Sequence, residues 1–344
     1  MSVRRRGTAA LVALAAAFSL AACGSDGGSE ESAPPAAGAD KKAVAQGGED
    51  FAEAATKTAG YGTDAKPGEF PRTVTHAMGK TVVKARPERV IVLDVGEFDN
   101  VVSLGVEPVG YAPTEGDVAI PSYLEKGAGS PKSVGTINGL NLEAIAALKP
   151  DLILGSQLRA ADKYDELSAI APTVFSIRPG FTWKENFRLN AAALDRSAAA
   201  DKALDAYDAK VKALSTDIGA DKPTVSMVRY MPGKIRLYAK ASFIGTILDD
   251  LGVPRPANQR INDLAVEVSP EKIDEADADW IFTGVYGDAK ATNRDTARAN
   301  PLWKNLKAVK SGQASDVPDE TWYLGLGATA AGLVLDDLRG FLAE

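Results

Sequence analysis

Short apolar runs alternate with amphipathic segments through most of the chain. The runs RVIVLD (Arg89–Asp94), DLILGS (Asp151–Ser156) and TVFSI (Thr173–Ile177) are rich in the apolar, β-branched residues of buried parallel strands. Helix-like segments such as FDNVVSLGV separate these runs. Strand–helix alternation with short connections predicts an α/β lobe with a mostly parallel sheet.

The alternation restarts after a segment of more than thirty residues, Trp183–Ile218, that contains no proline or glycine. This segment predicts either two helices or one helix that spans the molecule. Beyond it, TVSMVRY and DWIFTGV again resemble buried strands. We therefore expect an α/β fold of two doubly wound lobes joined by a long backbone helix. The expected ranges are 70–182 for the N-terminal lobe, 183–220 for the connecting helix and 221–344 for the C-terminal lobe.

Two matching segments, NLEAIAALKPDLIL and SPEKIDEADADWIF, each place a glutamate in the first turn of a predicted helix. Glu143 follows the N-cap candidate Asn141, and Glu271 follows Ser269. Either glutamate alone is explained by its favourable interaction with the helix dipole. The repetition in both lobes predicts one carboxylate per lobe at the rim of a cleft, a spacing suited to a partner with two-fold symmetry.

Candidate ligand-binding residues lie where predicted strands end or predicted helices begin. Ligands of open α/β sheets bind outside the carboxyl ends of the strands, and two facing lobes would form a small-molecule site between them. The candidates are Arg159, Arg229, Tyr286, Trp183, Trp322 and Tyr323. The two tryptophans either line a pocket or cap a helix by hydrophobic contact. Arg229 either forms an ion pair between the lobes or donates to ligand oxygens.

The sequence of 344 residues contains one cysteine, Cys23, and one histidine, His76. These counts exclude an intrachain disulfide and a zinc site built from several His or Cys ligands. A Ser-His-Asp hydrolase would need His76, which precedes the first convincing strand and which we expect at the surface. An extracytoplasmic hydrolase and a structural lipoprotein without a ligand stay as alternatives.

The N-terminus combines a basic stretch, MSVRRRG, an apolar stretch and the small residues LAAC. This pattern resembles a lipoprotein signal peptide over residues 1–22, with lipid attached to Cys23 and the protein held outside the cytoplasm. An ordinary signal peptide with an incidental cysteine is the alternative. Residues 23–69 are rich in Gly, Ser, Ala, Pro and acids, and we expect a flexible linker there. The net charge of −7 argues against nucleic-acid binding.

Three separate stretches resemble one family: Val225–Pro256, NLEAIAALKPDLILGS and WYLGLGATAAGLVLDDL. Over about residues 70–344 the chain resembles the substrate-binding lipoproteins of iron–siderophore ABC importers, a family that also takes up ferric hydroxamates, haem and cobalamin. The resemblance implies the helical-hinge, class III periplasmic-binding-protein fold. It also implies a monomer without enzyme activity or cofactor, which binds a ferric siderophore and delivers it to a permease.

The resemblance also assigns residues. Glu143 and Glu271 would dock on arginines of the two permease subunits. Arg229 and Trp322 would bind the ligand. Tyr286 and Trp183 would also contact it. The siderophore would itself coordinate the iron, so no direct metal site is implied.

Few cleft arginines favour a hydroxamate of ferrioxamine or ferrichrome type over an anionic catecholate, with haem or cobalamin as the alternative. The chain departs from the family at Asp195, where members often have a glycine that closes the first helix after Trp183. This departure leaves the course of the connecting helix open.

Overall fold

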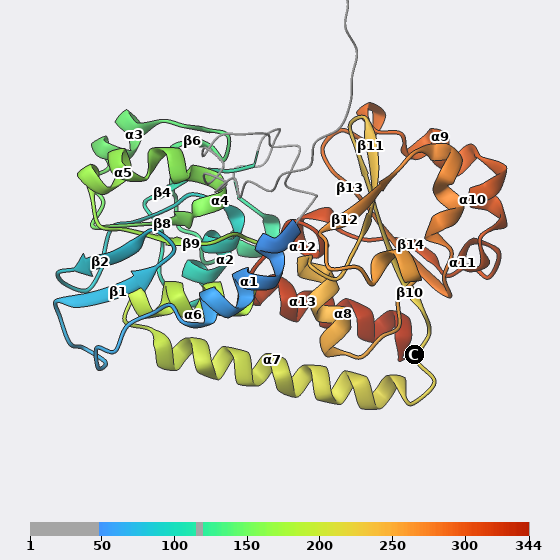
Figure 1. The fold of residues 1–344 in the computed structure, drawn as a ribbon, viewed down its shortest axis with the longest axis horizontal. Coiled ribbons are helices and arrows are strands. Elements are labelled where there is room, and N and C mark those ends of the chain that lie inside the picture. Colours follow the sequence, from blue (N-terminus) through green and yellow to red (C-terminus); the bar gives the residue numbers. More distant parts are fainter. Residues whose placement is uncertain (1–47, 115–119, 344) are drawn as a thin grey trace, which may run out of the picture. The chain divides into compact units, whose positions relative to one another are not determined.

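The structure is a computed structural model that describes residues 48–114 and 120–343, all within one compact unit of the chain (Figure 1). The predicted signal peptide over residues 1–22 and the predicted lipid acceptor Cys23 lie outside these residues. The described residues form two α/β lobes, each with its own sheet.

The N-terminal lobe contains a five-stranded parallel sheet in the order β5-β4-β3-β8-β9. Its strands are β3 (Val90–Val92), β4 (Gly110–Tyr111), β5 (Lys132–Ser133), β8 (Leu152–Ser156) and β9 (Thr173–Ser176). Strands β3, β8 and β9 are buried throughout, which explains their unbroken apolar sequences.

The helices of this lobe are α2 (Val95–Ser103), α3 (Leu142–Ala147), α4 (Gln157–Ala160) and α5 (Tyr164–Ile170), with 3-10 turns at Ser122–Leu124 and Ala161–Lys163. Two antiparallel hairpins complete the lobe: β1 (Arg72–His76) with β2 (Gly79–Val83), and β6 (Gly135–Thr136) with β7 (Gly139–Leu140).

The sheet of the C-terminal lobe is mixed, in the order β12-β11-β10-β13-β14. Its strands are β10 (Val225–Met231), β11 (Lys234–Tyr238), β12 (Ala265–Val268), β13 (Trp280–Val285) and β14 (Ala314–Asp316). Strands β10, β13 and β14 are parallel, whereas β11 pairs antiparallel with both β10 and β12. The expected mostly parallel arrangement therefore describes only one side of this sheet.

The helices of this lobe are α8 (Phe243–Asp250), α9 (Arg294–Ala299), α10 (Pro301–Asn305), α11 (Lys307–Lys310), α12 (Asp319–Trp322) and α13 (Ala328–Leu342). Its 3-10 segments are η4 (Ala257–Gln259), η5 (Pro270–Ala276) and η6 (Ala289–Ala291).

The expected connecting helix over 183–220 is two helices, α6 (Trp183–Ala193) and α7 (Ser197–Ile218). The break lies at Asp195, whose φ of +58° is left-handed and cannot continue a right-handed helix. The Asp195 carboxylate accepts from the Gly68 amide at 2.9 Å and from Arg72 and Arg86, each at 2.6 Å. Burial raises the pKa of Asp195, but these hydrogen bonds outweigh burial and hold the pKa at about 2. The anchored Asp195 carboxylate therefore lies in the break between α6 and α7.

Helix α7, with 22 residues, runs along the lower side of both lobes in Figure 1. It packs against α6 and against the C-terminal helix α13. Near its end the Ser215 hydroxyl donates to the Leu251 carbonyl at 3.4 Å. Helix α7 is the longest of the described helices, and it contacts elements of both lobes.

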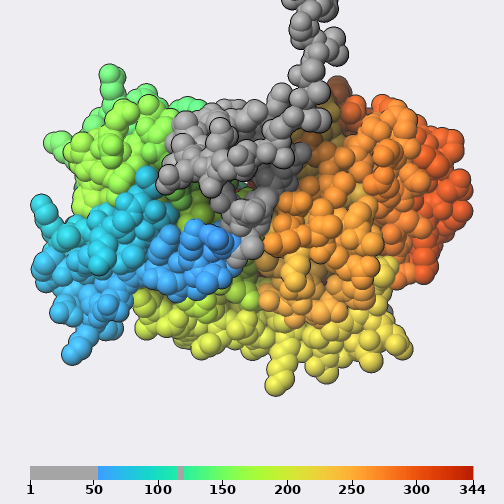
Figure 2. Space-filling model, in the orientation of Figure 1, coloured from blue at the N-terminus to red at the C-terminus, as the bar shows by residue number. Residues whose placement is uncertain are grey.

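The expected flexible linker over residues 23–69 is wrong for the part that the structure describes. Helix α1 (Gly48–Ala59) packs against α6 and buries Ala54 and Thr58. The chain then forms a β-bridge between Gly62 and Thr75. Figure 2 shows the blue residues of α1 beside those of the β1–β2 hairpin. The ordered domain therefore begins at least twenty residues earlier than residue 70, because Asp195 and α6 hold this segment.

The surface position expected for His76 is also wrong. The imidazole is buried at the end of β1, where Nε2 lies 2.9 Å from Thr81 Oγ1 and Nδ1 accepts from the Met78 and Phe175 amides at 3.3 Å. Burial lowers the pKa of His76 to about 4, so the ring is neutral at physiological pH. His76 is therefore a structural side chain.

Among the described residues, no helix is both long and apolar enough to cross a membrane.

Candidate functional site

The N-terminal part of the site lies where the connections of the first sheet diverge. From β3 the chain continues to β4 and β5 on one side, and from β8 it continues to β9 on the other. This divergence marks the preferred ligand position of an open α/β sheet. Asp94 follows β3 and Arg159 follows β8. The Arg159 Nε donates to Asp94 Oδ2 at 2.9 Å, so an ion pair lies across the divergence point.

Glu97 lies in the first turn of α2, directly beside this ion pair. Its side chain is 2% exposed, and its Oε2 atom makes no hydrogen bond within the described residues. Burial raises the pKa of Glu97 to about 8, and the negative charge of Asp94 adds to this effect, while Arg159 opposes it. Burial also raises the pKa of Tyr111, together with the charges of Asp94 and Glu97. At neutral pH this part of the site therefore contains a largely protonated Glu97 beside the Asp94–Arg159 ion pair.

The C-terminal part of the site lies at the ends of β10 and β13. Arg229 is 4% exposed and pairs with Asp319 of α12: Nε donates to Oδ1 at 2.7 Å, and Nη2 donates to Oδ2. A third donor, Nη1, lies 3.0 Å from the Tyr238 hydroxyl. The ion pair joins two elements of one lobe, so the alternative of a lobe-to-lobe pair for Arg229 is wrong.

Tyr286 connects the two halves. It follows β13, and its ring centroid lies 4.7 Å from the guanidinium carbon of Arg229, a cation–π distance. Burial lowers the pKa of Arg159, but electrostatic interactions with Asp94, Glu97 and Tyr286 outweigh burial and raise it. Three of the sequence-predicted residues, Arg159, Arg229 and Tyr286, are therefore brought together from both lobes.

The structure does not bring the two tryptophans into this group. Trp183 and Trp322 are fully buried, so the pocket-lining role expected for them is corrected to core packing. The Trp183 Nε1 donates to Thr246 Oγ1 at 3.1 Å, and its ring packs edge-on against Tyr207 and Phe243. The Trp322 Nε1 donates to Asp337 at 2.9 Å. Trp183 is the first residue of α6 and Trp322 the last residue of α12, and both indoles fill the core at these helix ends.

Tyr323 belongs partly to the site. Its hydroxyl lies 2.9 Å from the Val228 carbonyl and 3.0 Å from that of Phe282, so the polar end is used within the sheet. Its ring centroid lies 5.5 Å from the Arg229 guanidinium carbon. A Cβ at Gly284 would lie 2.5 Å from this ring, so the close approach requires glycine. The Tyr323 ring therefore packs beside the Arg229 guanidinium group.

Several polar side chains of the site, or after a strand at the same edge of its sheet, were not predicted from the sequence: Asp94, Glu97, Tyr238 and Asp319 in the site, and Arg178 after β9. Arg178 follows β9, is largely buried and lies 5.4 Å from the Phe181 ring centroid. A usable signal exists for Asp94 and Arg178, since each is a charged residue directly after an apolar strand. No local pattern reveals Asp319, because its partner is 90 positions away in the chain.

The two repeated glutamates are exposed, one in each lobe. Glu143 lies in α3, where Asn141 caps the helix by accepting from the Ala144 amide at 2.9 Å. Glu271 lies in η5, a 3-10 segment interrupted at Lys272, and Ser269 makes no capping bond to its backbone. A hydrogen bond from Ser269 instead lowers the pKa of Glu271. The second copy thus keeps the exposed carboxylate but not the predicted α-helix.

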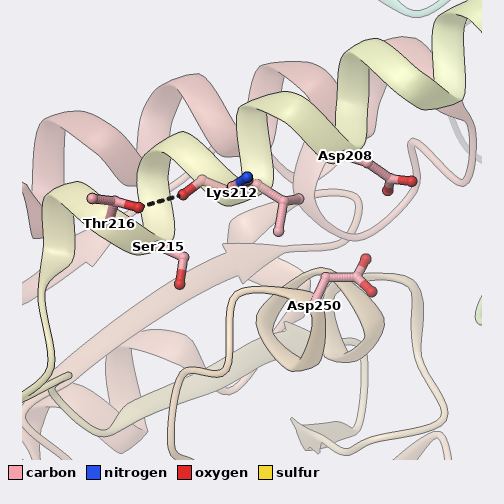
Figure 3. Close-up of a pocket in the computed structure, with 6 residues that line it drawn as sticks. Asp208, Lys212, Ser215, Thr216 and Asp250 are labelled. Atoms are coloured by element: carbon pink, nitrogen blue, oxygen red, sulfur yellow. Dashed lines mark hydrogen bonds between the residues drawn. The ribbon is translucent and has the colours of Figure 1, made fainter.

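Two surface cavities lie away from this group. One, of about 420 Å³, lies between α7 and α8 (Figure 3) and is lined by Asp208, Val211, Lys212, Ser215, Thr216 and Asp250. The other, of about 370 Å³, is lined by residues 59–65 and parts of the β1–β2 hairpin. Neither includes Arg159, Arg229 or Tyr286.

Within residues 48–114 and 120–343, no three His, Cys, Asp or Glu side chains are grouped to hold a metal ion.

Comparison with known proteins adds an independent observation. A family model described as "Periplasmic binding protein" matches residues 90–321. The chain is 38% identical over 292 residues to the "Probable siderophore-binding lipoprotein YfiY" of Bacillus subtilis, covering 79% of this chain and 88% of that protein. It is 34% identical to the "Fe(3+)-citrate-binding protein YfmC" of the same organism, covering 73% of this chain and 79% of that protein.

Among solved structures, the fold matches Staphylococcus aureus SirA complexed with staphyloferrin B, with a TM-score of 0.73 and 34% identity. The match covers 78% of this chain and 98% of SirA.

The buried Arg229–Asp319 pair makes a direct prediction about stability. Asp319→Ala leaves a guanidinium buried without its carboxylate, and we expect the free energy of unfolding to fall by about 3 kcal/mol. Urea unfolding of the ligand-free protein measures this change. The control is Asp336→Ala, which removes the Lys210–Asp336 pair, whose side chains are 47% and 56% exposed. The control should lose less than about 1 kcal/mol. Equal losses in the two variants would contradict the structural role of Asp319.

Proposed function

Because the chain belongs to the periplasmic binding protein family, with the substrate-binding lipoproteins of iron–siderophore importers, we propose that it captures a ferric siderophore outside the cytoplasm and delivers it to an ABC importer. The observation that carries this proposal is the convergence of Arg159, Tyr286 and Arg229 from the two lobes. The family consists of binding proteins rather than enzymes, and we assign no catalytic residue and no cofactor.

The site offers suitable chemistry for such a ligand. A ferric siderophore surrounds its iron with oxygen atoms and carries apolar linkers. The Arg159 and Arg229 guanidinium groups are planar donors for oxygens of this kind, and the Tyr286 ring is a surface for the linkers. The siderophore supplies the iron ligands, so the protein need not coordinate the metal.

The charge of the site supports an uncharged ferric complex. Each arginine already pairs with an aspartate, Arg159 with Asp94 and Arg229 with Asp319. The two pairs together carry no net charge, which favours a ferric hydroxamate of ferrioxamine or ferrichrome type. A ferric complex of citrate type is the second candidate, because the name of one relative is that of a ferric citrate-binding protein.

Haem and cobalamin remain as alternatives of the same fold. The single histidine, His76, is buried in the N-terminal lobe and held by Thr81 and two backbone amides, which weakens a role as haem ligand.

Titration calorimetry of the purified protein tests this function. The panel contains ferrichrome, ferrioxamine, ferric citrate, a ferric catecholate, haem and cobalamin. We expect saturable binding of a ferric siderophore and at least tenfold weaker binding by Arg229→Ala, equivalent to about 1.4 kcal/mol. The control is Arg339→Ala, which removes the exposed Arg339–Asp217 pair and should keep the parent affinity. Unchanged affinity in Arg229→Ala removes this arginine from the site, and saturation by haem or cobalamin alone overturns the proposed ligand.

The exposed glutamates support a proposal about delivery. We propose that Glu143 and Glu271 dock the protein on two permease subunits, since each lobe presents one of these two repeated glutamates at its surface. Lipid attached to Cys23 would hold the protein, as a monomer, at the cell membrane where the permease lies. The name of one relative also includes the word lipoprotein.

Uptake of ⁵⁵Fe-labelled ligand by cells tests the docking. The variant Glu143→Ala with Glu271→Ala should abolish uptake and keep the affinity of the purified protein, because neither side chain touches the ligand site. The matched control replaces Glu107 and Asp336, an exposed acid in each lobe, by alanine and should leave uptake unchanged. Normal uptake by the first variant, at equal protein levels, would show that these glutamates do not dock.

A further inference from the structure

We propose that Glu97 determines which ligand charges the site accepts: its protonated carboxyl keeps the N-terminal half of the site neutral, and loss of the proton makes that half negative. The proposal deepens the function proposed above and rests on it for the identity of the ligand. It assigns to Glu97 a role in specificity through the Asp94–Arg159 pair rather than a direct contact.

The geometry around Glu97 is unusual for an acidic residue. Asp94 caps α2 by accepting from the Val95 amide at 2.7 Å, and its other oxygen accepts from Arg159. Arg159 therefore balances Asp94, and no second cation is paired with Glu97 among the described ion pairs. Glu97 Oε2 is buried and has no hydrogen-bond partner within the described residues. An ionised carboxylate in that position would be costly, whereas a protonated carboxyl is not.

The charged groups near Glu97 come from few elements. Asp94 at the start of α2 and Arg159 of α4 act on it directly, and Tyr111 at the end of β4 interacts with its charge. Asp99, also on α2, accepts from the first amides of α13. Helices α6 and α13 pack against α2, and four charged side chains on them have other partners: Lys184 with Asp250, Asp336 with Lys210, Asp337 with Trp322, and Arg339 with Asp217. On the same two helices Glu185 is half-buried and Arg188 is exposed, and neither acts on Glu97.

The consequence for binding follows from the charge balance. With Glu97 protonated, the carboxyl pair and Arg159 sum to zero. With Glu97 ionised, they sum to one negative charge beside the ligand position. An anionic ferric complex is then repelled, and an uncharged complex is not. The sign of the pH effect on affinity therefore depends on the charge of the ligand.

The first test needs no ligand. Infrared spectra of the full chain at about pH 7.5 should contain the carbonyl-stretch band of a protonated carboxylic acid, which disappears when the pH is raised above about 9. Burial also raises the pKa of Asp99, to about 6, and that of Asp319, so the difference between the wild type and Glu97→Gln assigns the band to Glu97. Glu97→Gln should lack the band, and the control Glu107→Gln, at an exposed glutamate, should retain it.

The second test measures affinity against pH for two probes, uncharged ferrichrome and the trianionic ferric complex of a tricatecholate. For the wild type we expect the affinity for the anion to fall at least about fivefold between pH 6.5 and 9.5, with little change for ferrichrome. Glu97→Gln should lack this fall, and the difference between the variant and the wild type is free of any pH dependence of the probe itself.

The outcomes separate the two proposals. A band that persists in Glu97→Gln, or an anion affinity with the same pH profile in variant and wild type, overturns the role of Glu97. If neither probe saturates the protein, the proposed function fails for these ligand classes, and the infrared comparison still decides whether Glu97 carries the proton.

Discussion

Burying a guanidinium group is costly unless a carboxylate and further hydrogen-bond partners replace the water that it loses. Both lobes meet this constraint at the carboxyl edge of the sheet, with Arg159 on Asp94 and Arg229 on Asp319. The position of α12 follows from it, because Asp319 must reach the end of β10. Two arginines are thereby held in fixed orientations before any ligand arrives, which lowers the entropy cost of binding.

A second buried carboxylate links the lobes. The N-cap residue of helix α13 is Gly327, which has no side chain to cap it, and Asp99 of α2 supplies the missing acceptor to the amides of Thr329 and Ala330 at 2.9 and 3.0 Å. A Cβ at residue 327 would lie 2.5 Å from Asp99, so glycine is required for this contact. The Tyr123 hydroxyl adds a bond of 3.3 Å to the Gly325 carbonyl. Relative movement of the lobes would break these contacts, which favours a modest closure on binding.

The sequence was sufficient to predict the parts of the fold that depend on local pattern. Buried strands such as β3, β8 and β13 have unbroken apolar runs, and α8 and α13 have clear helical periodicity, so both lobes could be predicted. Strand β11 was missed because its alternation of Lys, Ile, Arg and Leu is short and follows β10 through a turn at Gly233. Helix α1 was not predicted, and its residues were assigned to a flexible linker, because the helix is held by packing on α6 rather than by its own composition.

The same distinction between local pattern and tertiary contacts applies to the residues of the candidate site. Arg159, Arg229 and Tyr286 could be predicted because they lie at the ends of recognisable strands. Asp319, Tyr238 and Glu97 could not, since their importance comes from contacts between distant segments and from burial. The tryptophans were misplaced for a related reason: a loop position before a helix does not tell whether the indole faces solvent or the core. Only tertiary packing decides that.

The most direct test of the central claim is a crystal structure of the protein with its ferric ligand, with anomalous scattering recorded at the iron absorption edge. We expect one iron peak beside Arg159, Tyr286 and Arg229, within reach of side chains from both lobes. An iron peak at the cavity along α7, or at any place that these three residues do not reach, would contradict this expectation.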